Sequence, residues 1–254
     1  MFFRGRLLCF YFVLGIFLLL VFLLSREFFL GTLGLRCCRR CLEGFFSWLT
    51  MFAKLFKVFC CCCFMGLKGS ETERNLLKAF AGESQARNRY SYFASVAKKE
   101  GFVQIGEIFL ETANNEKEHA KIFFKYLEGG DAEIVASYPA GRIGATKENL
   151  LAAADGEKLE WSGLYPEFER VAREEGFGDV ADSFKEIAEV EGYHERRYRK
   201  LLRNVRDGKV FIKDEKVKWK CGNCGYVHEG KDAPDVCPAC KHGREYYEIW
   251  VENY

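Results

Sequence analysis

Two separate stretches of the chain each carry a glutamate followed three positions later by a histidine. In ETANNEKEHA, residues 111–120, the pair is Glu116 and His119, and in EIAEVEGYHE, residues 186–195, it is Glu191 and His194. Residues three apart lie on one face of a helix, so each pair can converge on a single point. One such pair alone is usually solvated, but two of the four histidines of the chain fall into this repeated pattern.

Two unpaired glutamates lie in largely apolar surroundings, Glu83 in AFAGESQARNRY and Glu157 in LAAADGEKLEW. Glu83 precedes Glu116 by almost the same interval as Glu157 precedes Glu191, so an antiparallel partner helix can bring each to the level of its pair. Carboxylates that face a core are costly unless they are paired or bound to a cation. One Glu from each of two helices and an ExxH pair from each of the other two is the ligand arrangement of di-iron carboxylate bundles. The pattern predicts a dinuclear site, and carboxylate with imidazole suits iron.

Glu160 breaks the symmetry, because it lies one turn after Glu157 and the equivalent region of the first hairpin offers no carboxylate. A seventh ligand would let one iron choose between Glu160 and His119, although a surface carboxylate would look the same in the sequence. Tyr90 and Tyr165 lie two turns beyond the unpaired glutamates. They can hydrogen-bond near the site or simply fill the core.

Two C-x-x-C pairs, CGNCGY and CPAC, are separated by twelve residues near the end of the chain. Their spacing lets four thiolates bind one ion tetrahedrally, and these come from Cys221, Cys224, Cys237 and Cys240. Gly222 and Gly225 are expected to relieve the tight turns. The spacing fits zinc in a ribbon and iron in a rubredoxin-like site equally. His228 and His242 are expected at the surface, because four cysteines complete the coordination.

Four long helices must position the carboxylates. They are predicted over about 70–101, 102–127, 146–175 and 179–205, with an irregular crossover over 129–145. Ser70 and Glu73 fit a capping box, Thr146 can cap the third helix, and Pro166 should kink it. VAKKEGFVQIGEIF (96–109) aligns with VAREEGFGDVADSF (171–184), and ten of the 24 positions from 96 to 119 are identical in 171–194. A duplicated hairpin with one long connection predicts a mainly α, ferritin-like four-helix bundle followed by a small β/metal-knuckle domain.

Residues 1–64 differ in composition from the rest of the chain. They contain eight of the twelve cysteines, eight Lys or Arg against two Glu, and no Asp, Asn, Gln, His or Pro. The remainder carries 30 basic and 34 acidic side chains, which gives no support for nucleic-acid binding. No cysteine lies between Cys63 and Cys221, so the pattern indicates a reducing compartment. We therefore expect a cytoplasmic catalytic part.

The apolar run LLCFYFVLGIFLLLVFLL, residues 7–24, is long enough for a transmembrane helix. More basic residues follow it than precede it, which favours an anchor that leaves the rest of the chain in the cytoplasm. A misassigned start, with translation beginning at Met65, explains the composition equally well. The expected domains are thus a hydrophobic Cys-rich leader over 1–65, a di-iron bundle over 66–208 and a rubredoxin-like domain over 216–254.

Residues 66–254 closely resemble the rubrerythrin family. The resemblance is carried by AFAGESQARNRY, the two ExxH pairs, EGGDAEIVASYPAG, EKLE, REEGF and WKCGNCGYVHEG, in that order. It implies two non-haem irons in the bundle and one iron held by the four cysteines. The implied di-iron ligands are Glu83, Glu116, His119, Glu157, Glu160, Glu191 and His194. One iron is then expected to move between His119 when reduced and Glu160 when oxidised.

The resemblance also implies an activity, a peroxidase that reduces hydrogen peroxide to water in anaerobic or microaerobic cells. Electrons would come from a rubredoxin or an NADH-dependent reductase through the single iron, and the family is commonly homodimeric. Two other functions fit the residues: an iron-handling ferroxidase, and a zinc-ribbon interaction protein on a structural bundle. An FeS₄ module argues against iron storage, which needs no dedicated electron input.

Overall fold

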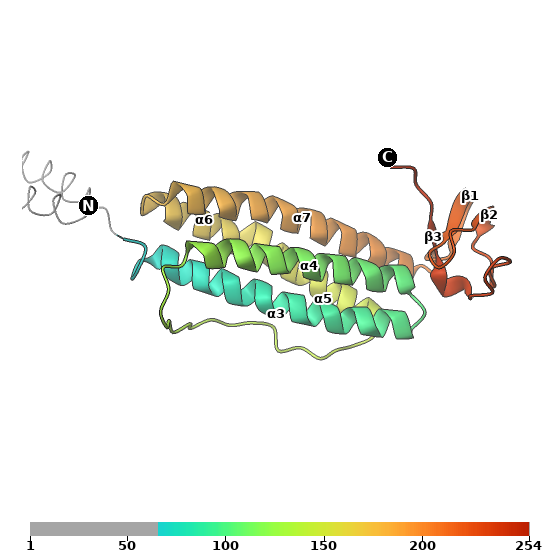
Figure 1. The fold of residues 1–254 in the computed structure, drawn as a ribbon, viewed down its shortest axis with the longest axis horizontal. Coiled ribbons are helices and arrows are strands. Elements are labelled where there is room, and N and C mark those ends of the chain that lie inside the picture. Colours follow the sequence, from blue (N-terminus) through green and yellow to red (C-terminus); the bar gives the residue numbers. More distant parts are fainter. Residues whose placement is uncertain (1–65, 254) are drawn as a thin grey trace, which may run out of the picture. The chain divides into compact units, whose positions relative to one another are not determined.

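The computed structural model describes residues 66–253. Four long helical rods form a bundle, and a small sheet follows them in the chain (Figure 1). The rods are α3 (Glu71–Lys99), α4 (Val103–Tyr126), the composite α5 (Thr146–Leu159), η1 (Glu160–Leu164) and α6 (Tyr165–Glu174), and α7 (Gly178–Arg206). The predicted fold class, a ferritin-like bundle followed by a small β domain, is confirmed.

The helix starts agree with the prediction in one case and differ in the other. Ser70 caps α3, and its Oγ accepts a hydrogen bond from the N–H of Glu73 at 2.9 Å. The carboxylate of Glu73 reaches back to the N–H of Gly69, one residue further than in a capping box. The prediction that Thr146 caps the third helix is wrong. Ala145 is the N-cap, and the carboxylate of Glu148 accepts a hydrogen bond from its N–H.

The third rod is interrupted by the π-helical turn η1 immediately before Pro166, where the sequence predicts a kink. Pro166 has no N–H to donate to the carbonyl four residues earlier, and its ring crowds that carbonyl. The backbone therefore widens, and the N–H of Tyr165 bonds to the carbonyl of Glu160 five residues before it. This widened turn begins at Glu160, the residue that breaks the symmetry of the repeat.

A long irregular connection joins α4 to α5, as the crossover over 129–145 predicts. Gly129 and Gly130 open it with φ of 84° and 89°, a conformation that favours glycine. The connection runs along the bundle beside α3 (Figure 1). There the hydroxyl of Tyr138 donates to the carbonyl of Lys78 at 2.7 Å. The connection therefore covers the part of α3 that carries Gly82 and Glu83.

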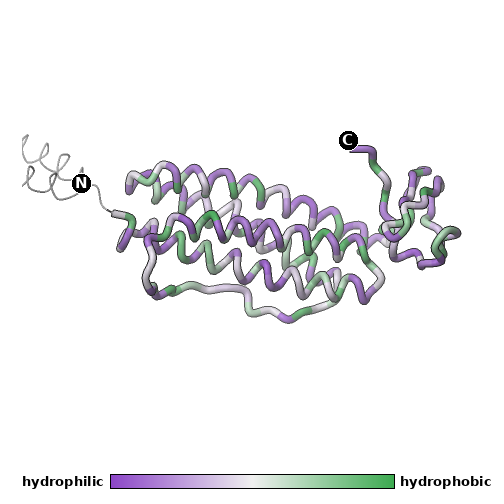
Figure 2. The backbone as a smooth tube through the Cα atoms, viewed as in Figure 1, coloured by the Kyte–Doolittle hydropathy of each residue, from purple (hydrophilic) through white to green (hydrophobic). Residues whose placement is uncertain are grey.

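Apolar and polar residues alternate along every helix of the bundle (Figure 2). The buried apolar residues form two separate clusters, one around Tyr90, Phe109 and Tyr198 and the other around Phe123 and Phe184. Along each helix the predicted metal ligands fall between the residues of these two clusters. The bundle thus encloses a polar layer between the two apolar clusters.

The small domain contains a three-stranded antiparallel sheet in the order β2-β1-β3. Its strands are β1 (Ile212–Cys221), β2 (Val227–Asp232) and β3 (Tyr247–Ile249). Its core holds Trp219, Tyr247 and two of the cysteines. Within residues 66–253, no helix is long and apolar enough to cross a membrane. The candidate span over 7–24 and the rest of the leader lie outside the described residues.

Candidate metal centres

Six of the seven predicted bundle ligands converge in the polar layer and form two overlapping groups. One group contains Glu83, Glu116, His119 and Glu191, and the other contains Glu116, Glu157, Glu191 and His194. Within each group, one ligand atom from every residue lies within 4.8 Å of the others. All six side chains are buried. Two metal ions could therefore bind side by side and share two carboxylates.

The two shared carboxylates each direct one oxygen toward each histidine. Glu116 places Oε2 at 2.9 Å from Nδ1 of His119 and Oε1 at 3.3 Å from Nδ1 of His194. Glu191 places Oε1 at 2.9 Å from the first imidazole and Oε2 at 2.8 Å from the second. Two carboxylates placed in this way could bridge a pair of ions, and Nδ1 of each histidine would then be the ligand atom.

Each unpaired glutamate accepts a hydrogen bond from a tyrosine of the other hairpin. Tyr90 on α3 donates its hydroxyl proton to Oε1 of Glu157 on α5 at 2.6 Å. Tyr165 on α6 donates to Oε1 of Glu83 on α3 at 2.5 Å. Both tyrosines are also buried in the apolar clusters, so each fills the core and orients a carboxylate. The sequence offered these roles as alternatives, and the structure combines them.

The arrangement of the buried carboxylate oxygens suits a bound cation. Apart from the two imidazoles just described, Oε2 of Glu83, Oε1 of Glu116 and both oxygens of Glu191 have no hydrogen-bond partner among the described residues. Buried polar atoms normally find such partners, and unpaired buried carboxylates are strongly disfavoured. A hard cation on each side of the bridging carboxylates would satisfy these oxygens. The donor set, carboxylate oxygens with one imidazole per ion, suits iron.

Glu160 stands outside both ligand groups. It is half-buried at the start of η1 and lines a cavity of about 300 Å³ together with Gly82, Tyr138 and Tyr165. His119 occupies the ligand group in its place. In the structure His119 belongs to a ligand group and Glu160 lies outside both groups; the exchange between them stays a prediction.

The buried acids and imidazoles shift one another's proton affinities. Burial, reinforced by neighbouring carboxylates, raises the pKa of Glu83, Glu157 and Glu160 well above the usual value. Burial opposes the protonation of His119, but Glu116 and Glu191 outweigh it and raise the pKa of His119 to about 9. Without metal, the cluster thus favours the binding of protons.

The metal-free protein is expected to lose stability as the pH rises from 6.5 to 9. A histidine with a raised pKa stabilises the fold fully below its unfolded pKa of 6.5, and this contribution disappears toward the folded pKa of about 9. For His119 alone, the shift in pKa corresponds to a loss of about 3 kcal/mol in the free energy of unfolding. The raised pKa values of Glu83, Glu157 and Glu160 act in the same direction between the ordinary glutamate pKa of about 4.5 and their higher pKa in the folded state.

Glu191 changes the stability with pH in the opposite direction, but in a lower pH range. Burial raises its pKa, yet the two imidazoles prevail and lower it to about 2, so its contribution is lost only as the pH falls from 4.5. Thermal unfolding of chelator-treated protein at pH 6, 7.5 and 9 measures the effect. Iron-loaded protein is the comparison, because metal competes with protons and binds more tightly as the pH rises. A metal-free melting temperature that rises over this range would contradict the prediction.

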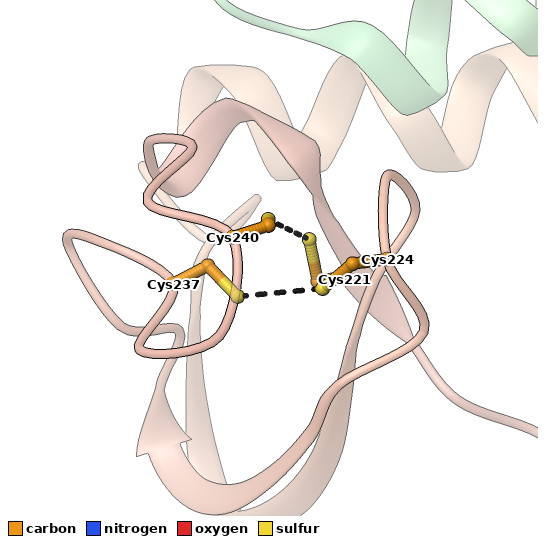
Figure 3. A group of neighbouring side chains, drawn as sticks. All are labelled: Cys221, Cys224, Cys237 and Cys240. Atoms are coloured by element: carbon orange, nitrogen blue, oxygen red, sulfur yellow. Dashed lines mark hydrogen bonds between the residues drawn. The ribbon is translucent and has the colours of Figure 1, made fainter.

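The four cysteines of the small domain converge on one point (Figure 3). The sulfur of Cys221 lies 3.7 Å from that of Cys240, and the sulfur of Cys224 lies 3.6 Å from that of Cys237. All four sulfurs lie within 4.8 Å of one another, which is the spacing of a tetrahedral thiolate site. His228 and His242 do not belong to this group, and both side chains are half-buried.

Two similar turns form the cysteine site. The carbonyl of Cys221 accepts a hydrogen bond from the N–H of Gly225 at 2.8 Å, and that of Cys237 accepts one from Lys241 at 2.9 Å. Gly225 has φ of 82°, as its predicted turn role requires, and Lys241 takes the same left-handed conformation with φ of 64°. Gly222 instead permits a close approach, since a Cβ there would lie 3.3 Å from the carbonyl oxygen of Tyr246.

A four-helix bundle that brings four carboxylates and two imidazoles together in two overlapping ligand groups defines a di-iron carboxylate protein. The Cys₄ site adds an iron–thiolate module to this class. The helical region matches the family model described as Rubrerythrin over residues 74–202, and the C-terminal region matches "Rubrerythrin, rubredoxin-like domain" over residues 219–248. The chain belongs to the rubrerythrin family. Its cofactors are therefore a di-iron centre and one iron in the Cys₄ site, which resolves the choice between iron and zinc.

Curated relatives agree with this assignment. The rubrerythrin of Nitratidesulfovibrio vulgaris is 57% identical over 188 residues, which cover 74% of this chain and 98% of the relative. The rubrerythrin of Porphyromonas gingivalis is 60% identical over 188 residues, covering 74% and 94%. Rubrerythrin-1 of Clostridium acetobutylicum is 59% identical over 193 residues, covering 74% and 98%. The chain thus spans nearly the whole of each relative.

Proposed function

We propose that the protein is a non-haem di-iron peroxidase that reduces hydrogen peroxide to water. The reaction consumes one peroxide, two electrons and two protons and yields two water molecules. When bound, the di-iron centre supplies the two electrons and the Cys₄ iron relays single electrons to it. The observation that carries the proposal is the combination of a bridged dinuclear site with a separate one-electron centre in the same chain.

Access to the site supports the proposal. The cavity beside the polar layer is lined at its inner side by Gly82, Glu160 and Tyr165, and Arg89 and Lys78 also line it. A water molecule occupies about 30 Å³ of liquid, so a cavity of about 300 Å³ admits a peroxide with several waters. Gly82 leaves a small space in the cavity wall, because a Cβ there would be in ordinary van der Waals contact with Tyr138 at 3.6 Å and Glu160 at 3.9 Å. Peroxide can therefore reach the side of the site that Glu160 faces.

In this proposal, the titratable groups beside the cavity transfer the protons. Burial and the neighbouring carboxylates raise the pKa of Glu160 well above its usual value, which favours the protonated form of this side chain beside the cavity. Giving up that proton would leave a carboxylate free to replace His119 as a ligand. Glu160 would then act both as a proton donor and as the exchangeable ligand, while Tyr90 and Tyr165 keep Glu157 and Glu83 in place.

The test is anaerobic consumption of peroxide by the full chain, fully loaded with iron and reduced before mixing. One equivalent of peroxide should disappear as the iron is oxidised, without released radicals. Peroxide that persists over fully loaded, reduced protein would refute the proposal. Glu160→Ala is expected to slow this single turnover while it retains the bound iron, because all six residues of the two ligand groups remain.

An iron-handling ferroxidase is the second candidate, since the same bundle ligands could oxidise Fe(II) and release it. The two functions differ in the fate of the metal. A peroxidase keeps its irons through repeated turnover with a donor such as a rubredoxin or an NADH-dependent reductase, whereas a ferroxidase consumes added Fe(II). Iron analysis before and after turnover therefore separates them.

A further inference from the structure

Asn115 makes a contact with one of the two histidines that no motif in the sequence singles out. Its side-chain amide on α4 lies 3.3 Å from Nε2 of His194 on α7. Nδ1 of the same imidazole faces the carboxylates of Glu191 and Glu116, so the two ring nitrogens have different tasks. One nitrogen lies at the metal site, and the other is held by the amide.

The chemistry of a ligating imidazole determines the direction of this hydrogen bond. When Nδ1 of His194 holds a cation, Nε2 retains its proton and becomes a donor. The amide of Asn115 can rotate to present either its oxygen or its nitrogen, because the two occupy equivalent positions. Its oxygen then accepts the proton of Nε2. A histidine held in this way is fixed in tautomer and ring orientation.

The internal repeat shows that the other histidine has no such partner from the equivalent position. The alignment that superposes the two ExxH pairs also pairs Asn115 with Val190 and His194 with His119. Both Asn115 and Val190 are half-buried and lie four positions before a histidine of an ExxH pair. The side chain of valine cannot accept a hydrogen bond, so the position that holds one imidazole provides no side-chain acceptor at its equivalent in the other hairpin.

We propose that Asn115 is a positioning residue that fixes His194 as a permanent ligand, and that Val190 leaves His119 able to leave the metal. This inference rests on the proposed exchange of His119 for Glu160 and adds the reason why this histidine is the one that moves. Glu160 supplies the ligand that replaces a histidine in this exchange. The unequal restraint on the two imidazoles then determines which ligand it replaces.

Zinc(II) provides a test that involves neither peroxide nor electrons. The full chain, labelled with ¹⁵N-histidine and loaded with Zn(II), should show one slowly exchanging Nε2–H, that of His194, and a fast one for His119. Asn115→Val should accelerate exchange at His194 and weaken Zn(II) binding at the bundle by about 10- to 100-fold. Asn115→Asp, which retains an acceptor oxygen, should restore slow exchange.

Val190→Asn is the reciprocal variant and keeps the test decisive if Asn115→Val folds poorly. It should slow the exchange of the His119 Nε2–H. Unchanged exchange at His194 in folded Asn115→Val, or unchanged exchange at His119 in folded Val190→Asn, would overturn the inference. If the exchange pattern holds but wild-type iron protein fails to consume peroxide, the positioning role stands and the proposed peroxidase function falls.

Discussion

Glu191→Gln is expected to leave a protein that holds the Cys₄ iron but neither iron of the bundle. Glu191 belongs to both ligand groups and directs one oxygen toward each histidine at 2.9 and 2.8 Å. Its replacement therefore removes a charged ligand from both ions at once. The amide keeps the volume of the side chain, so the loss comes from coordination and not from a cavity. Iron analysis and the visible spectrum of the FeS₄ centre measure the two sites separately.

The stability of the protein should change with its iron content. Metal present at about 1,000 times its dissociation constant stabilises the folded state by about 4 kcal/mol. Wild-type protein should lose this increment on chelation, whereas Glu191→Gln should melt at the same temperature with and without added Fe(II). Glu189→Ala on the exposed side of α7 is the matched control and should bind iron normally. Retention of both bundle irons by Glu191→Gln would show that the bridging assignment is wrong.

Cys221→Ser is expected to abolish donor-linked peroxide turnover and to spare a single turnover. The sulfur of Cys221 is buried and lies 3.7 Å from that of Cys240, so its loss opens the tetrahedral site. The residues of the two candidate di-iron ligand groups lie on the helices of the bundle and are unchanged in this variant. A protein reduced chemically before mixing should therefore still consume one equivalent of peroxide, but a rubredoxin or reductase should no longer sustain the reaction.

The matched control for this variant is Asn223→Ala, which lies between two of the cysteines and removes an exposed side chain that is not a ligand. It should retain the FeS₄ spectrum and full turnover. Continued donor-linked turnover by Cys221→Ser, with the single iron absent, would mean that electrons reach the bundle by another route. Loss of the single turnover as well would mean that the two sites depend on each other structurally.

The parts of the fold that follow from helical periodicity were predictable from the sequence. Glu116 and His119 lie three apart, and any helix places them on one face. The internal repeat required a second pair in the same relation, and the structure brings Glu191 and His194 to them. The crossover was likewise predictable, because Gly129 and Gly130 end a helix and a long irregular segment follows.

Features that depend on how two elements pack were not predictable in this way. Tyr90 and Tyr165 share a helical rod with Glu83 and Glu157 respectively, yet each bonds the glutamate of the other hairpin. The π-helical turn is a local compromise around Pro166 that widens the backbone where a kink was expected. The outward position of Glu160 depends on a cavity formed by the crossover, which the spacing of residues cannot reveal.

The crossed tyrosines have a consequence for how such a site could arise. A single hairpin would carry one unpaired glutamate, one ExxH pair and one tyrosine, and that tyrosine would have no carboxylate of its own to hold. Two identical hairpins that meet about a two-fold axis would satisfy both tyrosines and complete both ligand groups. The present chain therefore has the form of an ancestral homodimer joined by the crossover. Glu160 and Asn115 have no counterpart of the same type in the other hairpin, a difference that two identical hairpins could not show.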